Sequence, residues 1–266
     1  MDTIFSDAPL PALGLAIFLA LALAWEAGAR WRQRSAGSDD GDAGHGYILS
    51  AVLGLLALLI AFTFGLALNR FETRRELVVR EANAISTAEM RAHLLDAEPA
   101  TRLSGLLHDY ARVRLQYGEA RAAQKPPLLA ASADLRARIQ AETLAALQPL
   151  RTTPLAPALA SAVNDTLDIG VEREAAHAAR LPSVVMAILV VYAAVAAAVL
   201  GYAVGVSHRQ HRLESALLFV LLSLALCLVL DLDRARDGAI QVSQAPMRQL
   251  VAGFAATPPA SPASPP

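Results

Sequence analysis

The chain has 266 residues, of which 55% are hydrophobic and only 18% charged, whereas about a quarter of a soluble globular protein is charged. Its net charge of −1 argues against a nucleic-acid partner, and its single cysteine, Cys227, excludes a disulfide within the chain. This composition is typical of a protein that crosses a membrane several times.

Four stretches are apolar and long enough to cross a bilayer as helices of about 20 residues. The first lacks a basic N-terminal flank and carries Asp2 and Asp7 there instead, so we expect a retained span rather than a cleaved signal peptide. An even number of spans places both termini on the side that holds the long segment between spans two and three. The predicted spans are Pro9 to Gly28, Gly46 to Leu68, Leu181 to Val206 and Leu213 to Leu230.

The segment between the second and third spans contains no convincing strand. Its apolar residues recur at helical spacing, and its prolines mark breaks between helices. We therefore predict an all-α subunit in which a helical soluble domain is inserted between spans two and three, with its first and last helices continuous or nearly so with those spans. The predicted parts are the first transmembrane helix with its flanks (1–34), a flexible loop (35–46), the second transmembrane helix (47–69), the helical domain (70–180), the third transmembrane helix (181–207), a turn with the fourth (208–232), a juxtamembrane segment (233–252) and a disordered proline-rich tail (253–266).

The end of the second span carries a recognisable pattern, because an apolar helix continues there into an arginine-rich one without a turn residue. The pattern resembles the second transmembrane helix of the bestrophins, although Phe71 replaces one family tryptophan and the other is absent. It consists of Phe62, Ala67, Arg70, Phe71, Glu72, Arg74 and Asn83.

Most of the remaining chain resembles the bestrophin-like family of bacterial and plant membrane proteins. The matching pieces are 74–83, 164–168, 181–182, 230–234 and positions between Gly238 and Pro246. This resemblance implies a homo-oligomer, a pentamer, in the bacterial inner membrane, with the termini and the helical domain in the cytoplasm. Arginines near the spans number eight on that side and five on the other, which decides little for a long loop.

The resemblance also implies that the second span lines a pore. The bestrophin neck positions correspond here to Gly54, Leu58 and Phe62, and the last two suit an apolar constriction. Gly54 departs from the bulky residue of that family. The alternative is that this helix simply packs in a bundle through its small residues Ala57, Ala61 and Gly65. Ala193, Ala197, Gly201 and Gly205 form a second such stripe in the third span, which we expect to serve helix packing.

Acidic residues follow the fourth span in the sequence DLDRARDG. Asp231, Asp233 and Asp237 form a weak candidate calcium site, because a distal glutamate is missing and arginines lie between the acids. We favour a salt-bridged cap, in which Asp231 or Asp233 meets Arg70, Arg74 or Arg75 at the join between the membrane and helical domains. Three further polar residues are expected to be buried between helices: Asn83, Asn164 and Asp168.

We expect neither a cofactor nor an enzyme, because no phosphate loop, nucleophile motif or intramembrane carboxylate cluster is visible. Two functions remain. The first is an oligomeric channel for passive ion permeation, with exit arginines that favour anions. The second is a non-conducting membrane scaffold or sensor whose helical domain binds a partner.

Overall fold

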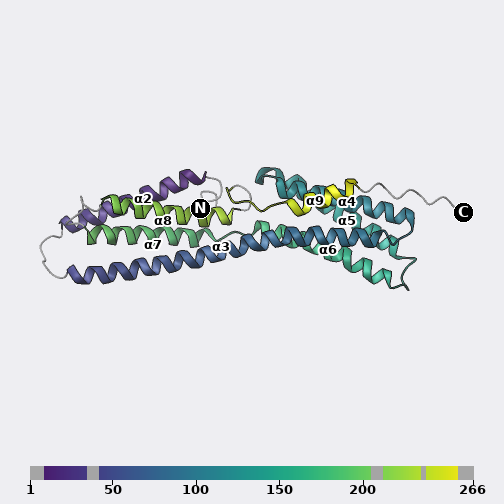
Figure 1. Cartoon of the computed structure of the whole chain (residues 1–266), viewed down its shortest axis with the longest axis horizontal. Coiled ribbons are helices and arrows are strands. Elements are labelled where there is room, and N and C mark those ends of the chain that lie inside the picture. Colours follow the sequence, from purple (N-terminus) through teal and green to yellow (C-terminus); the bar gives the residue numbers. More distant parts are fainter. Residues whose placement is uncertain (1–8, 35–41, 205–211, 235–237, 257–266) are drawn as a thin grey trace. The chain divides into compact units, whose positions relative to one another are not determined.

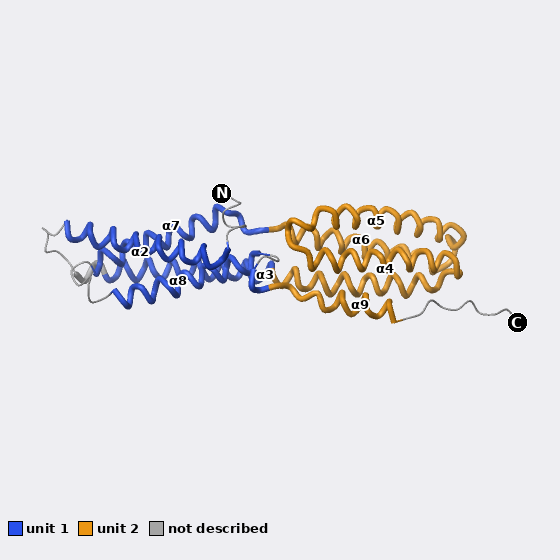
Figure 2. Tube along the Cα trace, turned by 90° about the horizontal axis from the view of Figure 1, so that it is seen from above, with its two compact units in different colours: residues 1–70, 180–234, 238–240 blue, residues 71–179, 235–237, 241–266 orange. Residues whose placement is uncertain are grey.

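The structure, a computed structural model, describes residues 9–34, 42–204, 212–234 and 238–256, and the chain forms two compact units (Figures 1 and 2). The described residues contain helices and no strand, which confirms the all-α prediction. Unit 1 comprises residues 1–70, 180–234 and 238–240, and unit 2 comprises the rest. In chain order the helices are α2 (Leu10–Arg34), α3 (Asp42–Ala92), α4 (Ala97–Glu119), η1 (Ala122–Gln124), α5 (Lys125–Leu147), α6 (Leu155–Ala178), α7 (Ser183–Ala203), α8 (Arg212–Asp233) and α9 (Ala245–Ala256).

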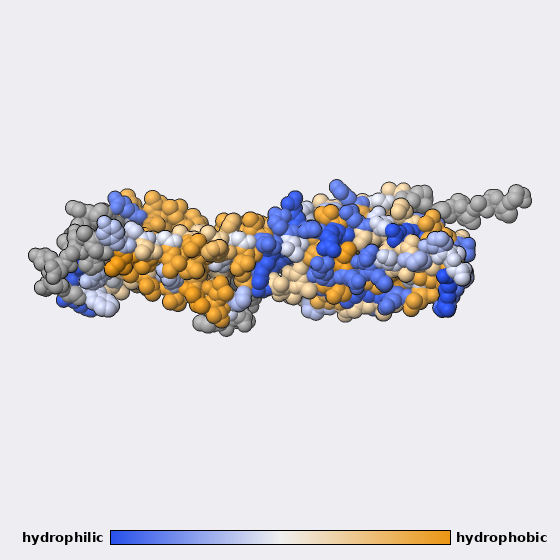
Figure 3. All heavy atoms as spheres, turned by 90° about the horizontal axis from the view of Figure 1, so that it is seen from below, coloured by the Kyte–Doolittle hydropathy of each residue, from blue (hydrophilic) through white to orange (hydrophobic). Residues whose placement is uncertain are grey.

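Unit 1 contains α2, α7, α8 and the apolar part of α3 up to Arg70, which belong to the four helices that are long and apolar enough to cross a membrane. Its surface in Figure 3 is mostly apolar. Its tightest contact joins α2 to α7. A Cβ atom on Gly28 would lie 2.0 Å from the carbonyl oxygen of Ala198, and one on Gly201 would lie 2.0 Å from that of Trp25. The two backbones therefore touch. The predicted stripe of α7 serves helix packing at Ala193, Ala197 and Gly201, while its fourth member, Gly205, lies outside the described residues.

The apolar part of α3 is less buried than the other spans. Only 17% of its most apolar window is buried within the chain, compared with 33% for α8. Leu56, Thr63 and Ala67 form its packed face. The small residues proposed for bundle packing, Ala57, Ala61 and Gly65, are exposed instead. This span therefore keeps a wide surface for lipid or for another protein chain.

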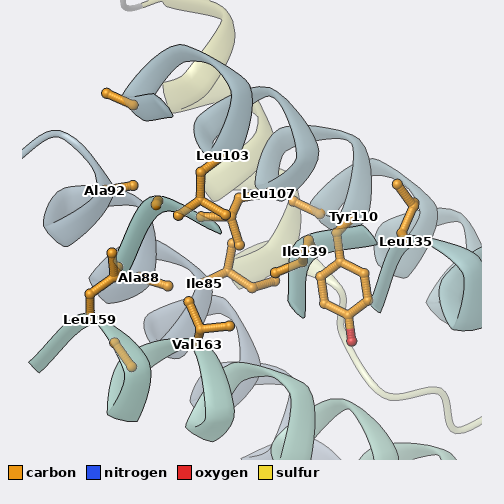
Figure 4. Packing of buried hydrophobic residues seen from close by; sticks show 14 of the residues in the cluster. Ile85, Ala88, Ala92, Leu103, Leu107, Tyr110, Leu135, Ile139, Leu159 and Val163 are labelled. Carbon is orange, nitrogen blue, oxygen red and sulfur yellow. The ribbon is translucent and has the colours of Figure 1, made fainter. Parts of the chain in front are cut away.

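Unit 2 is a helical bundle with its own apolar core. The part of α3 that follows Arg70 packs with α4, α5 and α6. The buried side chains of these helices interdigitate around Leu107 and Ile85 (Figure 4). α9 covers α4, where its Met247 is fully buried. The surface of this unit carries many hydrophilic residues (Figure 3). The hydrophobic effect, which removes these apolar side chains from water, drives the formation of this core.

The helix boundaries follow the prolines. α5 begins with proline at its first positions, where the missing N–H group costs nothing. α3 is one uninterrupted helix of 51 residues, which confirms continuity at the second span. α6 and α7 are separate helices, because the chain is extended at Ala179 and Pro182 between them. A short break at Arg180, Leu181 and Pro182 therefore separates α6 from α7.

Three expectations from the sequence need correction. Residues 42–46 of the predicted loop belong to α3, and residues 253–256 of the predicted tail belong to α9, while 35–41 and 257–266 lie outside the described residues. Helix α9 itself was not predicted. Asn83, Asn164 and Asp168 are exposed rather than buried, because each faces away from the core that its helix neighbours form.

Candidate functional site

The predicted neck residues lie on the open side of α3. The side chain of Phe62 is 66% exposed and that of Leu58 is 49% exposed. Gly54 is also exposed, and a Cβ atom there would meet nothing within 4 Å. Within one subunit, these three positions are therefore largely uncovered. Their placement leaves them available to line a path between copies or to face lipid.

The exit of the fourth span is tied to the start of α7 by Asp233. The backbone N–H of Leu181 donates to both carboxylate oxygens of Asp233, at 2.9 and 3.1 Å. Arg70, at the end of the unit 1 part of α3, places its guanidinium 3.9 Å from the same carboxylate. One acidic side chain thus joins three membrane helices at their common end, as a salt-bridged cap would.

Asp231 organises the turn that follows α8. Its two oxygens accept hydrogen bonds from the backbone N–H groups of Ala239 and Ile240, at 2.7 and 3.1 Å. A Cβ atom on Gly238 would lie 2.0 Å from the nearer oxygen, so a larger residue there would displace the Asp231 carboxylate. The carboxylate therefore serves as a cap for the turn. Asp237, the third residue of the weak calcium candidate, lies outside the described residues, which contain no cluster of three or more metal-ligating side chains.

The other two exit arginines belong to unit 2. Arg74 is buried and donates to the carbonyl oxygens of Ala176, at 3.1 Å, and Ala179, at 2.7 Å. These carbonyls end α6, where the helix dipole favours a positive charge. Arg75 is exposed and pairs with Glu72 at 3.3 Å, as its spacing predicts. Arg74 therefore fixes the end of α6 to α3, which is a structural task.

A buried charge network crosses unit 2 and was not anticipated. Its centre is Glu81 on α3, whose side chain is fully buried. One carboxylate oxygen accepts from Nε of Arg114 on α4 at 2.5 Å, and the other pairs with Arg173 on α6. The Arg114 guanidinium also donates to Glu174 at 2.5 Å and to the carbonyl oxygen of Gly170 at 3.0 Å. Each buried charge is thus matched by an opposite charge and hydrogen bonds.

The network extends to α5 and to the segment before α9. Arg136 on α5 donates to Glu174 at 2.7 Å. Arg173 donates to the side-chain oxygen of Gln244 at 2.8 Å, and a Cβ atom on Gly118 would collide with both groups. Gln244 is itself buried and donates to the carbonyl oxygen of Val242. Arg173 therefore connects the long helix α3 to the C-terminal segment of the chain.

Aromatic side chains enclose this network. Burial and neighbouring charges shift the pKa values of several groups in and around it. Burial raises the pKa of the Tyr110 hydroxyl to about 12. Burial alone would lower the pKa of Arg114, but Glu81, Tyr110 and Glu174 together raise it above its ordinary value. The pKa of His177 is lowered to about 3, first by burial and then by the positive charges of Lys125 and Arg173. His177 is therefore neutral at physiological pH.

His177 makes the stability of the protein depend on pH. Its pKa is about 3 in the folded chain and about 6.5 when unfolded, so the contribution to stability is complete above pH 6.5 and is lost as the pH falls toward 3. At pH 5 the loss is about 2 kcal/mol. We expect His177→Gln to reduce the difference between melting temperatures measured at pH 7.5 and pH 5. His93→Gln, at an exposed position, is the control, and an equal reduction there would contradict the prediction.

The sequence does carry a signal for this network. On α3 and on α4, one charged residue lies within the apolar stripe of the helix, where a charge that faces solvent is not expected. Arg114 follows Leu107 and Tyr110 and precedes Tyr117 at helical spacing, where a solvent-facing charge does not belong. Glu81 likewise lies between Leu77 and Ile85 on α3. The family pattern in the sequence favours Asn83 and Asp168 instead, and both of these residues are exposed.

Comparison with known proteins gives a family and a fold. The model of the bestrophin-like domain matches residues 14–247. No curated protein matches the chain. One solved structure, described as the crystal structure of a membrane protein G175A, superposes with a TM-score of 0.62 at 14% sequence identity, covering 96% of each chain. At that identity, the likeness concerns the fold alone. The family match covers most of the chain, and with four apolar helices it identifies a multi-pass membrane protein that belongs to the bestrophin-like family.

Proposed function

We propose that the protein is a homo-oligomeric membrane channel for passive ion permeation, with α3 of each copy around a central axis. The observation that carries this proposal is the exposure of the apolar neck residues Leu58 and Phe62 on the least buried of the four spans. Membership in the bestrophin-like family and the membrane fold support it. A ring of five copies, as in the bestrophins that the sequence resembles, would enclose a pore that one subunit of four spans cannot.

The surface of α3 also offers a way for neighbouring copies to approach. Ala57, Ala61 and Gly65 recur every four residues and are exposed, next to the face that holds Phe62. Small residues at this spacing let helix backbones approach closely in a membrane, where dispersion contacts drive association. In the proposed ring these stripes pack α3 against its neighbours, while Leu58 and Phe62 turn to the axis. An apolar ring of this kind restricts flow by dewetting.

The proposed preference for anions rests on arginine charges beyond the neck. Of the three exit arginines, Arg74 is buried against α6, and the side chain of Arg70 is 33% exposed next to Asp233. Arg75 is 65% exposed and pairs with Glu72. Surface pairs of this type are weak, so the Arg75 charge still contributes to the local potential. A reversal potential measured in asymmetric salt tests this preference directly.

Replacement of Phe62 by alanine tests the pore. In the proposed ring Phe62 is the narrowest apolar position, so removal of the ring of benzyl groups widens the neck and favours its hydration. We expect Phe62→Ala to raise the ion current of the purified oligomer in planar bilayers severalfold. Phe64→Ala is the matched control, because Phe64 lies two residues further along α3 on a different face and is partly buried.

The same recordings identify the outcome that overturns the channel. If wild type and Phe62→Ala both stay silent in bilayers while the oligomer remains intact by mass, α3 does not line a conducting path. A monomer or dimer in mild detergent would count against the ring as well. Either result would favour a membrane scaffold whose helical unit 2 binds a partner.

A further inference from the structure

The face of α3 that holds the neck residues continues beyond the apolar part of this helix, because α3 is one uninterrupted helix of 51 residues. An α-helix has about 3.6 residues per turn, so two residues that lie eighteen positions apart point in the same direction after about five turns. Glu76 lies eighteen positions after Leu58, and Arg80 lies eighteen positions after Phe62. Both later residues are exposed. The face of Leu58 and Phe62 is therefore continued by Glu76 and Arg80.

The three exit arginines point away from this face. Arg70 lies eight residues after Phe62, which turns its side chain by about 80°, and Arg74 and Arg75 are turned further. Their contacts agree with this, since Arg70 lies 3.9 Å from Asp233 and Arg74 is buried against α6. The arginine charges therefore act on a path along the neck face only from the side.

Glu76 is the charge that this face presents. Its side chain is exposed, and within the part of the chain that the structure describes it makes no ion pair. Arg80 lies one turn further at a spacing that allows a pair with Glu76, but its guanidinium lies 3.5 Å from Glu172 on α6 instead. Asp165 and Asp168 on α6 line the same pocket as Arg80 and add negative charge. The positive charge of Arg80 is thus balanced, and that of the Glu76 carboxylate is not.

We propose that Glu76 is a selectivity-determining residue, whose carboxylate opposes the anion preference that the exit arginines give. This inference rests on the proposed function, in which α3 of each copy surrounds the axis. One carboxylate from each copy would then form a ring on the axis side, and a ring of this kind attracts cations and repels anions. The charges of Arg70 and Arg75 are partly offset by the carboxylates beside them, so the ring acts against a weakened positive potential.

Reversal potentials of the purified full-length oligomer in planar bilayers test this role. A gradient of potassium chloride across the bilayer gives the ratio of chloride permeability to potassium permeability. We expect Glu76→Gln to raise this ratio severalfold and Glu76→Asp, which keeps the charge, to leave it near that of wild type. The rise should shrink in solutions of about 1 M salt, where charges are screened over about 3 Å. Glu98→Gln is the control, because Glu98 lies on α4 and its side chain is 83% exposed.

Arg80→Gln should change the permeability ratio in the opposite direction, because it removes the positive charge that balances Glu172 on the same face. An unchanged ratio in Glu76→Gln, with currents and oligomeric mass like those of wild type, overturns the role of Glu76 and leaves the channel standing. An equal rise in Glu98→Gln also overturns it, since the ratio would then follow the net charge of the protein. Silence of both wild type and Phe62→Ala, with the oligomer intact, overturns the proposed channel and this role together.

Discussion

Glu81→Gln should cost the protein about 3–5 kcal/mol of stability, which is the range measured when one partner of a buried ion pair is removed. The change leaves the side-chain shape nearly intact. It removes the negative charge that faces the guanidinium groups of both Arg114 and Arg173. Two buried cations would then lie near each other without their shared counter-charge. Thermal unfolding followed by circular dichroism measures the loss.

Glu72→Gln is the matched control for this prediction. Glu72 lies on the same helix, but its side chain is 54% exposed and it pairs with Arg75 at the surface. Surface pairs contribute at most about 1 kcal/mol, so the control should unfold nearly as wild type does. Glu81→Gln combined with Arg173→Met should lose less than the two single losses added together, because both disturb one contact. Equal losses for Glu72→Gln and Glu81→Gln, or strict additivity of the pair, would contradict a shared buried network.

The sequence predicts the fold well where one residue pattern has one structural meaning. Apolar runs of about 20 residues specify the four spans, and the lack of any breaker after Leu68 predicts that α3 continues. Prolines mark the start of α5 and the break before α7. Helix α9 was missed because it is short and follows a region of mixed polarity. Its stability comes from contacts such as the stacking of Phe254 on His108, with ring centroids 3.9 Å apart, and no local pattern reports such contacts.

The charged residues are harder to predict because their role depends on the side of the helix that the bundle buries. Arg74 and Arg75 are neighbours in sequence, yet one is buried against the end of α6 and the other faces solvent. A rotation of 100° per residue separates their directions, and only the positions of neighbouring helices show which one is enclosed. The role of Leu58 and Phe62 stays a prediction for the same reason, since their exposure fits a pore axis and a lipid-facing surface alike.

Gly201→Ala should strongly destabilise the membrane unit, because the added methyl group has no space. The methyl carbon would lie 2.0 Å from the carbonyl oxygen of Trp25, and backbone atoms cannot turn aside as a flexible side chain can. α2 and α7 must separate, which loosens the contacts that hold both helices. Overpacking of this kind costs about 1–3 kcal/mol and sometimes more.

Gly28→Ala should have a similar effect, and the two changes together should cost less than the sum of the single losses. The reason is geometric: Gly28 and Gly201 face the same crossing, so one separation of the helices accommodates both methyl groups. Gly54→Ala on α3 is the control, since a Cβ atom there meets nothing within 4 Å and alanine is favoured over glycine inside a helix by about 1 kcal/mol. Thermal unfolding in detergent should therefore rank Gly54→Ala at or above wild type and both crossing variants well below it. If Gly201→Ala melts at the wild-type temperature, α2 and α7 do not touch at this crossing.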